Sequence, residues 1–251
     1  MSNYPLITLI TVCLNSEKTI EKTILSIKNQ TYKNIEYIII DGDSKDRTKS
    51  IINKYKRNIN IYISERDAGL YSAFNKGIKL VNGKIFGFVN SDDVLMPDAI
   101  ETLVKYYNRY PSVDFIFGSV KKHWGILHGY RPWRIKWSWY FYSSHSTGFY
   151  IKTKSAKEIG LYNTKYKYCA DLDYFYRAII KHKLKGMATK KNEIFGVFRR
   201  GGLSSRVNIL SLISEKAKIR IDNKQNKILV LIIFIFDYLI NIKKIIKQSI
   251  N

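Results

Sequence analysis

The stretch "GKIFGFVNSDDVLMPDA", residues 83–99, joins a run of apolar and aromatic residues to two adjacent carboxylates, Asp92 and Asp93. Near-continuous apolar runs fit a strand that is covered on both faces, as in an open parallel α/β sheet. Ligands of such sheets bind at the carboxyl ends of the strands, where this acidic pair stands. Taken alone, Ser-Asp-Asp is as typical of a polar turn, or of a cap for a helix beginning near Pro97, as it is of a ligand site.

Similar apolar runs occur elsewhere along the chain, and helical patterns separate them. Strands that alternate with helices predict a parallel sheet. The predicted strands are residues 6–12, 35–40, 60–63, 85–89 and 114–118. The predicted helices are residues 17–29, 46–57, 68–81 and a segment from Pro97 to just before Pro111.

The pattern changes after residue 118. The segment "HWGILHGYRPWRIKWSWYFYSSH", residues 123–145, is dense in Trp, Tyr and Arg and has little periodicity, which indicates a loop-rich second part. Helical character returns at residues 171–182, and residues 204–250 form a Lys-rich pattern typical of a helical tail. The chain is therefore expected to contain one α/β domain followed by helices.

The chain has 251 residues, 43 Lys and Arg against 20 Asp and Glu, and a formal net charge of +23. An excess of this size predicts an anionic partner, which is a nucleic acid, an anionic membrane or a phosphorylated substrate. Cys13 and Cys169 lie far apart in the sequence, so neither a disulfide framework nor a Cys-rich zinc site is indicated. We expect a reducing compartment.

The acidic residues that follow predicted strands narrow this choice of partner. Asp41 follows "YIII", and Asp92 and Asp93 follow "FGFV". In an open parallel sheet these strand ends meet in one crevice, where carboxylates repel one another unless a cation joins them. Mg²⁺ and Mn²⁺ bind one or two protein carboxylates and complete their shell with water and phosphate oxygens. A nucleoside diphosphate fits this arrangement.

Three ordered motifs carry a family resemblance. They are "TVCLNSEKTIEKTILSIKNQTYKNIEYIIIDGDSKDRT" (11–48), "SERDAGLYSAFNKGI" (64–78) and "GKIFGFVNSDDVL" (83–95). Together they closely resemble the N-terminal half of bacterial family 2 glycosyltransferases with the GT-A fold, of the type that builds surface polysaccharides. The resemblance implies a Rossmann-like, mostly parallel open sheet flanked by helices.

The resemblance also implies roles for single residues in binding a nucleotide-sugar donor. Thr11 and Asp41 match positions that hold the base and ribose, and Asp67 and Asn75 match a donor-site motif on the helix between the third and fourth strands.

The acidic pair matches the family's metal site for Mn²⁺ or Mg²⁺, here in the variant form Ser-Asp-Asp. Asp93 is the expected metal ligand. Asp92 is expected to contact the ribose or a metal-bound water, and it is the alternative metal ligand.

Family members of this kind invert the anomeric centre in one displacement and need a single general base. Residues 143–179 resemble the acceptor-side segment of the family, which makes Asp171 the expected base, although Ala170 stands where many relatives have Glu. Helix N-capping is the other interpretation of Asp171, and the two are compatible. Asp173 and Arg177 are spaced i, i+4 and are expected to form a supporting ion pair.

Two further features stay open at this point. His145 matches a position where relatives often carry a polar residue facing the phosphates or the acceptor, but a single His is more often structural. The segment "RRGGLSSR", residues 199–206, resembles a family segment near the diphosphate, and an ordinary Gly-rich linker is the alternative.

The C-terminal tail has nine consecutive apolar residues, 228–236, whereas a membrane-spanning helix needs about 20. A polar stripe then leaves a broad apolar face, which favours a helix lying in the plane of a membrane surface. The stripe consists of Asp237, Asn241, Lys244 and Gln248. Packing on the catalytic domain and a dimer contact are the competing interpretations. The aromatic segment 131–142 fits the headgroup region or stacking on an acceptor sugar.

We therefore predict a metal-dependent inverting hexosyl- or N-acetylhexosaminyltransferase. Its expected acceptor is a saccharide or a polyprenyl-diphosphate-linked saccharide in surface polysaccharide assembly, such as O-antigen or capsule. The predicted catalytic domain spans 1–203, with a nucleotide-sugar half (1–118) and an acceptor half (119–203), and the tail spans 204–251. We expect the protein in the cytoplasm, peripheral on the inner face of the plasma membrane, with no nucleic-acid partner.

Two other functions remain at this point. A nucleotidyltransferase also places carboxylates and Mg²⁺ at strand ends, but the segment "CLNSEKT" (13–19) lacks the Gly-rich phosphate loop expected for it. A non-enzymatic nucleic-acid-binding protein would explain the charge and the aromatic residues, but it leaves the ordered carboxylates unexplained.

Overall fold

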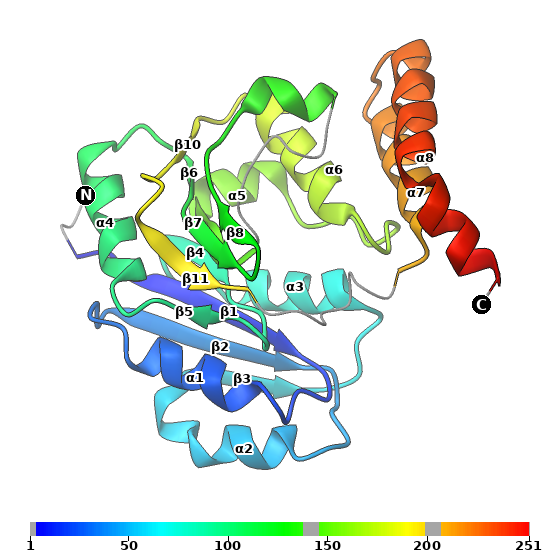
Figure 1. Cartoon of the computed structure of the whole chain (residues 1–251). Helices are drawn as coiled ribbons and strands as arrows, with labels where there is room; N and C mark the ends of the chain where they lie inside the picture. The colour runs from blue at the N-terminus through cyan, green and yellow to red at the C-terminus, as the bar shows by residue number, and fades with distance from the viewer. Residues whose placement is uncertain (1–3, 138–145, 199–206, 251) are drawn as a thin grey trace.

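The computed structural model describes residues 4–137, 146–198 and 207–250 (Figure 1). Its main sheet has seven strands in the order β10-β6-β9-β4-β1-β2-β3. The strands are β1 (Ile7–Cys13), β2 (Ile35–Asp41), β3 (Ile61–Ser64), β4 (Ile85–Phe88), β6 (Phe115–Phe117), β9 (Phe149–Lys152) and β10 (Gly186–Ala188). All five strands predicted from the apolar runs are present.

The strands of the N-terminal half pair in parallel, as their alternation with helices predicted. β1 lies between β2 and β4 and is parallel to both, and β3 continues the sheet beyond β2. The register sets Cys13 opposite Asp41 and Asp41 opposite Ser64. The carboxyl ends of these three strands therefore lie side by side.

Helices cover both faces of the main sheet, and the alternating side chains of the strands separate two cores. On one face, Leu9 and Ile39 pack with helices α1 (Ile20–Lys28), α2 (Thr48–Lys54) and α4 (Ala99–Arg109). On the other face, Ile10 and Ile38 pack with α3 (Leu70–Lys79), α5 (Thr153–Ile159) and α6 (Ala170–Tyr176). Burial on both faces explains why the strands appear in the sequence as continuous apolar runs.

The second half contains strands that the sequence pattern did not reveal. β9 runs antiparallel between β4 and β6 in the middle of the main sheet. A second sheet has the order β5-β11-β7-β8 and consists of β5 (Val94–Leu95), β11 (Ile194–Val197), β7 (Ser119–Lys122) and β8 (Gly125–Leu127). The expectation of a loop-rich second part is therefore only partly right, because β7, β8 and β9 lie in or next to a segment without periodicity.

The C-terminal segment forms a hairpin of two helices beside α6 (Figure 1). They are α7 (Ile209–Asp222) and α8 (Lys227–Ile250), so the predicted helical tail is confirmed. A π-helical turn, Arg177–Lys181, extends α6. Among the described residues no helix is long and apolar enough to cross a membrane. The predicted boundary between residues 203 and 204 falls outside the described residues and stays a prediction.

Candidate active site

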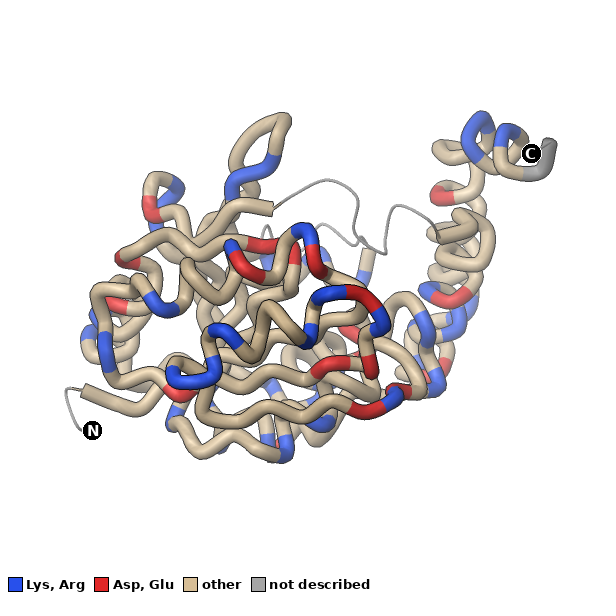
Figure 2. The backbone as a smooth tube through the Cα atoms, turned by 90° about the horizontal axis from the view of Figure 1, so that it is seen from below, with Lys and Arg blue, Asp and Glu red and all other residues tan. Residues whose placement is uncertain are grey.

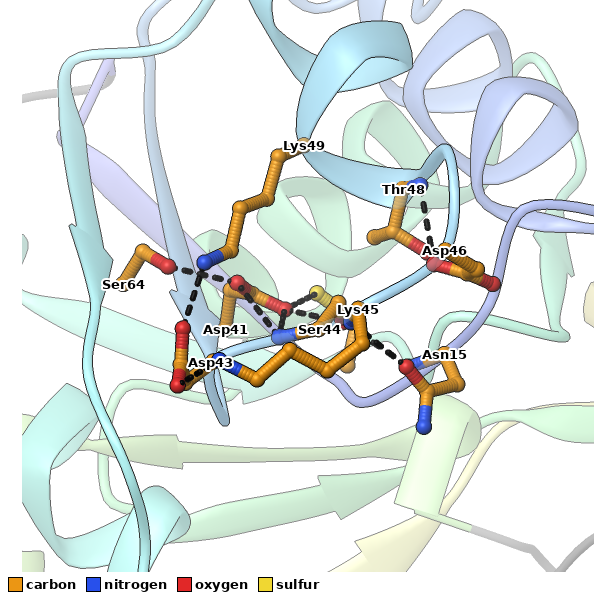
Figure 3. A network of polar contacts seen from close by, with 10 residues as sticks. Asn15, Asp41, Asp43, Ser44, Lys45, Asp46, Thr48, Lys49 and Ser64 are labelled. Atoms are coloured by element: carbon orange, nitrogen blue, oxygen red, sulfur yellow. Dashed lines mark hydrogen bonds and ion pairs between the residues drawn. The ribbon is translucent and has the colours of Figure 1, made fainter.

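The carboxylate of Asp41 organises the edge where β1, β2 and β3 end (Figure 3). Asp41 is fully buried, and its oxygens accept hydrogen bonds from the backbone N–H and the hydroxyl of Ser44. The Ser64 hydroxyl donates to Asp41 Oδ2 at 2.7 Å, and the Cys13 thiol lies 3.7 Å from Oδ1. A buried carboxylate needs such donors, because its desolvation is otherwise very costly. Asp41 therefore fixes the loop that follows β2.

The same loop carries an exposed ion-pair group. Asp43 has a positive φ of 65°, and its carboxylate lies 2.5 Å from the ammonium groups of both Lys45 and Lys49. Hydrogen bonds from these two lysines lower the pKa of Asp43 to about 2. The end of β2 and the loop after it thus carry one buried carboxylate, Asp41, and one partly exposed carboxylate, Asp43 (Figure 3).

Two of the predicted donor-binding residues lie inside the protein in this structure. Thr11 is fully buried in β1, and its hydroxyl accepts a hydrogen bond from Tyr37 at 3.0 Å. The side-chain amide of Asn75 pairs twice with the backbone of Tyr162, through Nδ2 to the carbonyl at 2.8 Å and through Oδ1 to the N–H at 2.9 Å. Asn75 thereby joins α3 to the second half of the domain, and donor contacts for both residues stay predictions.

Asp67 lies at the sheet edge, next to the loop that Asp41 fixes. A Cβ placed on Gly42 would come within 3.3 Å of Asp67 Oδ2, so these two segments approach closely. Lys76 Nζ lies 2.6 Å from Asp67 and 2.7 Å from Glu65. Asp67 of the predicted donor motif therefore lies in the loop before α3, beside the end of β2, and is paired with Lys76 of that helix.

The acidic pair after β4 divides into a buried member and a partly exposed member. Asp93 is fully buried, and its Oδ2 accepts a hydrogen bond from the Thr147 hydroxyl. Its backbone carbonyl accepts from the Thr23 hydroxyl at 2.7 Å, which ties the turn to α1. Asp92 is partly exposed. The backbone carbonyl of Asn90 closes the turn by accepting a hydrogen bond from the Asp93 N–H at 3.0 Å.

Asp171 lies in the first turn of α6 and contacts α3. The Tyr71 hydroxyl donates to Asp171 Oδ1 at 3.0 Å and also reaches the Tyr168 carbonyl at 3.1 Å. Burial raises the pKa of Tyr71 well above its usual value, and the charge of Asp171 adds to this effect. The phenol therefore stays protonated and donates to the carboxylate. Tyr71 is four positions beyond Asp67, so this contact brings Asp171 to the helix that follows the predicted donor residue Asp67.

The ion pair expected after Asp171 is present. Arg177 Nε lies 2.9 Å from Asp173 Oδ2, and Arg177 Nη2 donates to the Leu161 carbonyl at 2.8 Å. Asp173 also accepts from Asn223 Nδ2 at 2.9 Å. Their role in catalysis stays a prediction. His145 and the segment 199–206 lie outside the described residues.

Several polar residues at this site were not identified from the sequence. Tyr71, Thr147, Ser44 and Ser64 each donate a hydroxyl hydrogen bond to one of the predicted carboxylates. Ser44 follows Asp41 closely enough for a turn contact to be expected from the sequence. The other three contacts span 23 to 100 residues, and no local pattern announces them.

The family model "Glycosyl transferase family 2" matches residues 8–167, and the chain belongs to this family. A glycosyltransferase from Haemophilus influenzae is 33% identical over 134 residues, covering 51% of this chain and 42% of that protein. Another, from Methanocaldococcus jannaschii, is 28% identical over 189 residues, covering 70% of this chain and 65% of that protein. The matched region thus spans less than two thirds of either relative.

Solved structures show the same fold. The crystal structure of S. aureus TarS 1-349 superposes with a TM-score of 0.67 at 16% identity, covering 92% of this chain and 71% of that chain. The mannosyltransferase PcManGT from Pyrobaculum calidifontis, in complex with GDP-Man and Mn²⁺, superposes with a TM-score of 0.66 at 19% identity, covering 94% and 70%. The chain therefore belongs to glycosyltransferase family 2 and has the GT-A fold, as the sequence motifs predicted, and its family membership does not favour either alternative function.

Proposed function

We propose that the protein moves a hexosyl or N-acetylhexosaminyl group from a nucleoside-diphosphate sugar to a saccharide acceptor, with inversion at the anomeric carbon. The observation that carries this proposal is the Tyr71–Asp171 hydrogen bond of 3.0 Å. It holds a carboxylate of the acceptor half against the helix that carries the predicted donor motif. A single carboxylate in that place suits a direct displacement, which needs one general base.

In the proposed reaction Asp171 accepts the proton of the acceptor hydroxyl as that oxygen bonds to the anomeric carbon. The bond between this carbon and the diphosphate oxygen breaks, and its electron pair leaves with the nucleoside diphosphate. The Tyr71 hydroxyl occupies one lone pair of Asp171 Oδ1 and so fixes the orientation of the carboxylate. The protonated phenol does not compete for the acceptor proton.

A divalent metal, Mn²⁺ or Mg²⁺, is proposed at the acidic pair. The donor set fits a hard cation, because Asn90, Ser91, Asp92 and Asp93 offer only oxygen and amide groups. Among the described residues no group of three His, Cys, Asp or Glu could hold a metal, which fits an ion that completes its shell with diphosphate oxygens and water. When bound, this ion would stabilise the negative charge of the leaving diphosphate.

Asp93 is the predicted ligand, and its burial favours a second arrangement. A carboxylate with no exposed surface that accepts from Thr147 is well placed to hold the turn. The partly exposed Asp92 is better placed to reach a metal in solution. We therefore assign the direct contact to Asp92 and retain Asp93 as the alternative.

The donor is proposed to bind along the ends of β1, β2 and β3, near Thr11, Asp41, Asp67 and Asn75. Two fold neighbours support a nucleotide sugar as donor, because TarS has been solved with UDP-GlcNAc and PcManGT with GDP-Man. We propose an acceptor from surface polysaccharide assembly, such as O-antigen or capsule. This part of the proposal rests on the family resemblance and on the exposed apolar face of α8.

The exposed face of α8 supports an association with an anionic membrane. Seven apolar side chains on this face are between 48% and 72% exposed: Ile228, Leu231, Ile232, Ile235, Phe236, Leu239 and Ile240. Lys243 and Lys247 follow them and are also exposed. Such a face binds lipid by apolar burial together with charge attraction. We propose a peripheral position on the inner leaflet, where a polyprenyl-diphosphate-linked saccharide would be the acceptor.

The catalytic proposal is tested with Asp171→Asn and Asp92→Asn, and with Glu101→Gln as a control that removes an exposed carboxylate of α4 to which no catalytic or binding role is assigned. Thermal unfolding with a panel of nucleotide sugars, with Mn²⁺ or with a chelator, identifies the donor, because a ligand that binds only the folded state raises the melting temperature. Transfer is then measured with that donor. We expect Asp171→Asn to lose at least about 1,000-fold in transfer while keeping donor binding.

For Asp92→Asn we expect loss of the metal-dependent part of the melting-temperature shift. If Asp93→Ala alone loses this shift while remaining folded, Asp93 holds the metal instead. Transfer at the wild-type rate by Asp171→Asn would remove Asp171 from the mechanism.

A further inference from the structure

Glu215, in the middle of α7, accepts three hydrogen bonds from consecutive backbone N–H groups. Lys167 N–H donates to Oε2 at 2.8 Å, and the N–H groups of Tyr168 and Cys169 both donate to Oε1 at 2.7 Å. Consecutive N–H groups that point to one side form a concave site for an anion, which here is filled by a carboxylate of the same chain. The partners are 46 to 48 residues apart in the sequence.

The segment that Glu215 holds leads directly into the helix that carries Asp171. Cys169 is the N-cap residue of α6, and its own side chain makes no capping hydrogen bond. The first N–H groups of a helix lack partners within the helix, and a carboxylate near them is favourable. Glu215 thus provides from another helix the negative charge that the cap residue does not provide.

Other residues at the end of α7 hold the same region. Asn223 Nδ2 donates to Asp173 Oδ1 at 2.9 Å, and the Tyr166 hydroxyl donates to Asp222 Oδ2 at 2.6 Å. Contacts with α7 therefore lie on both sides of Asp171 in the sequence. Glu215 differs from the others in that it accepts from the backbone N–H groups of the segment that leads into α6.

We propose that Glu215 is a positioning residue for the catalytic base: it fixes the backbone of residues 167–169 so that the Asp171 carboxylate meets the Tyr71 hydroxyl. The inference rests on the proposed role of Asp171. A displacement of about 1 Å in a reacting group is enough to lower a rate by about 100-fold. A backbone segment held by three hydrogen bonds to one charged group is the type of support that prevents this displacement.

The test replaces Glu215 with Gln, which keeps the shape but loses the charge and one acceptor oxygen. We expect the kcat of Glu215→Gln to fall by about 10- to 100-fold, with donor affinity measured by thermal stabilisation unchanged. Glu215→Asp, which keeps the charge on a shorter side chain, is expected to recover part of the loss. Amide hydrogen exchange should become faster at residues 167–169 and stay unchanged in α1. Glu101→Gln is the control for removal of a carboxylate.

A double-mutant cycle separates this proposal from the proposed function. If Glu215 acts through Asp171, then Glu215→Gln has no further effect on the residual transfer of Asp171→Asn, because residues that act as a unit are not additive. A full additional loss in that background, or a parallel fall in donor affinity, would overturn the positioning role. Exchange at residues 167–169 that matches the wild-type would overturn it as well, whatever the activity. If Asp171→Asn is itself active, the proposed base is wrong, and the exchange data still report on the Glu215 contacts.

Discussion

The carboxyl edge of the main sheet and the C-terminal hairpin hold their polar groups in different ways. At the sheet edge, Asp41 is satisfied by groups 3, 23 and 28 residues away, on neighbouring strands and their loops. In the hairpin, Glu215 accepts from backbone N–H groups 46 to 48 residues away, and Arg220 donates to backbone carbonyls 84 and 85 residues away. The difference teaches that a sequence motif can contain most of a predicted donor site, whereas the support of the proposed base is assembled by the fold.

The two helices of the hairpin also differ from each other. The buried side of α7 carries Ile219 together with the charged Arg220, whose guanidinium donates to the Ile135 and Lys136 carbonyls at 2.9 and 3.0 Å. α8 instead exposes a broad apolar face on the outer side of the hairpin. Thus α7 packs into the α/β domain through Arg220, whereas α8 leaves its apolar face exposed. Lys and Arg positions are spread over the whole molecule, not gathered in one band (Figure 2).

The largest effect is expected at the sheet edge. Asp41→Ala removes a buried acceptor and leaves the Ser44 N–H and the Ser64 hydroxyl without their partner. We expect the free energy of unfolding to fall by about 3 kcal/mol, measured by denaturant titration at pH 7, together with loss of donor binding. Asp43→Asn, in the same loop but at an exposed ion pair, is the matched control and should change the unfolding midpoint little. Equal effects would contradict the view that Asp41 organises this edge.

A smaller effect is expected for the contact between α7 and the aromatic segment. Burial lowers the pKa of Arg220, yet its hydrogen bonds to two carbonyls and to Gln225 at 3.0 Å keep the charge satisfied. Arg220→Met should lower the free energy of unfolding by about 2 kcal/mol because those carbonyls lose a charged donor. Lys218→Met, on the exposed side of the same helix, is the control. If the two variants unfold alike, α7 is not integrated into the domain.

The smallest effect on stability is expected for α8. The triple variant Leu231→Ser, Ile235→Ser, Leu239→Ser changes only exposed side chains, so we expect a loss of less than about 0.5 kcal/mol per site. Its binding to vesicles containing phosphatidylglycerol should nevertheless fall at least about tenfold in a flotation assay, because each side chain would otherwise enter lipid. Asn241→Ser on the polar stripe is the control.

Wild-type binding by the triple variant would exclude the lipid surface as the partner of α8. A wild-type dimer that this variant converts to monomer would assign the face to a second copy of the chain. The polar stripe itself faces the protein in part, because the Gln248 side-chain carbonyl accepts a hydrogen bond from the Ile209 N–H of α7 at 3.0 Å. The apolar side is therefore the side left to a partner.

Much of the first half of the molecule could be predicted from its residues. Strands such as Ile7–Cys13 and Ile35–Asp41 are long, apolar and separated by amphipathic helices, so their period and order are visible in the sequence. β9 was missed because it follows a segment without periodicity. The strand nevertheless completes the main sheet, since β4 and β6 are both hydrogen-bonded to it. Short strands are specified by their neighbours more than by their own pattern.

The sequence by itself determined the parallel α/β fold, the family, and the positions of Asp41, the Asp92–Asp93 pair and Asp171, because these depend on local patterns and ordered motifs. Only the tertiary structure decided which carboxylates are buried, that Tyr71 donates to Asp171, and that Glu215 holds the backbone leading to it. The physical reason is the range of the interactions. Periodicity and turn chemistry act over a few residues, whereas the hydrogen bonds that orient the proposed base join residues 46 to 100 positions apart, and folding alone brings these together.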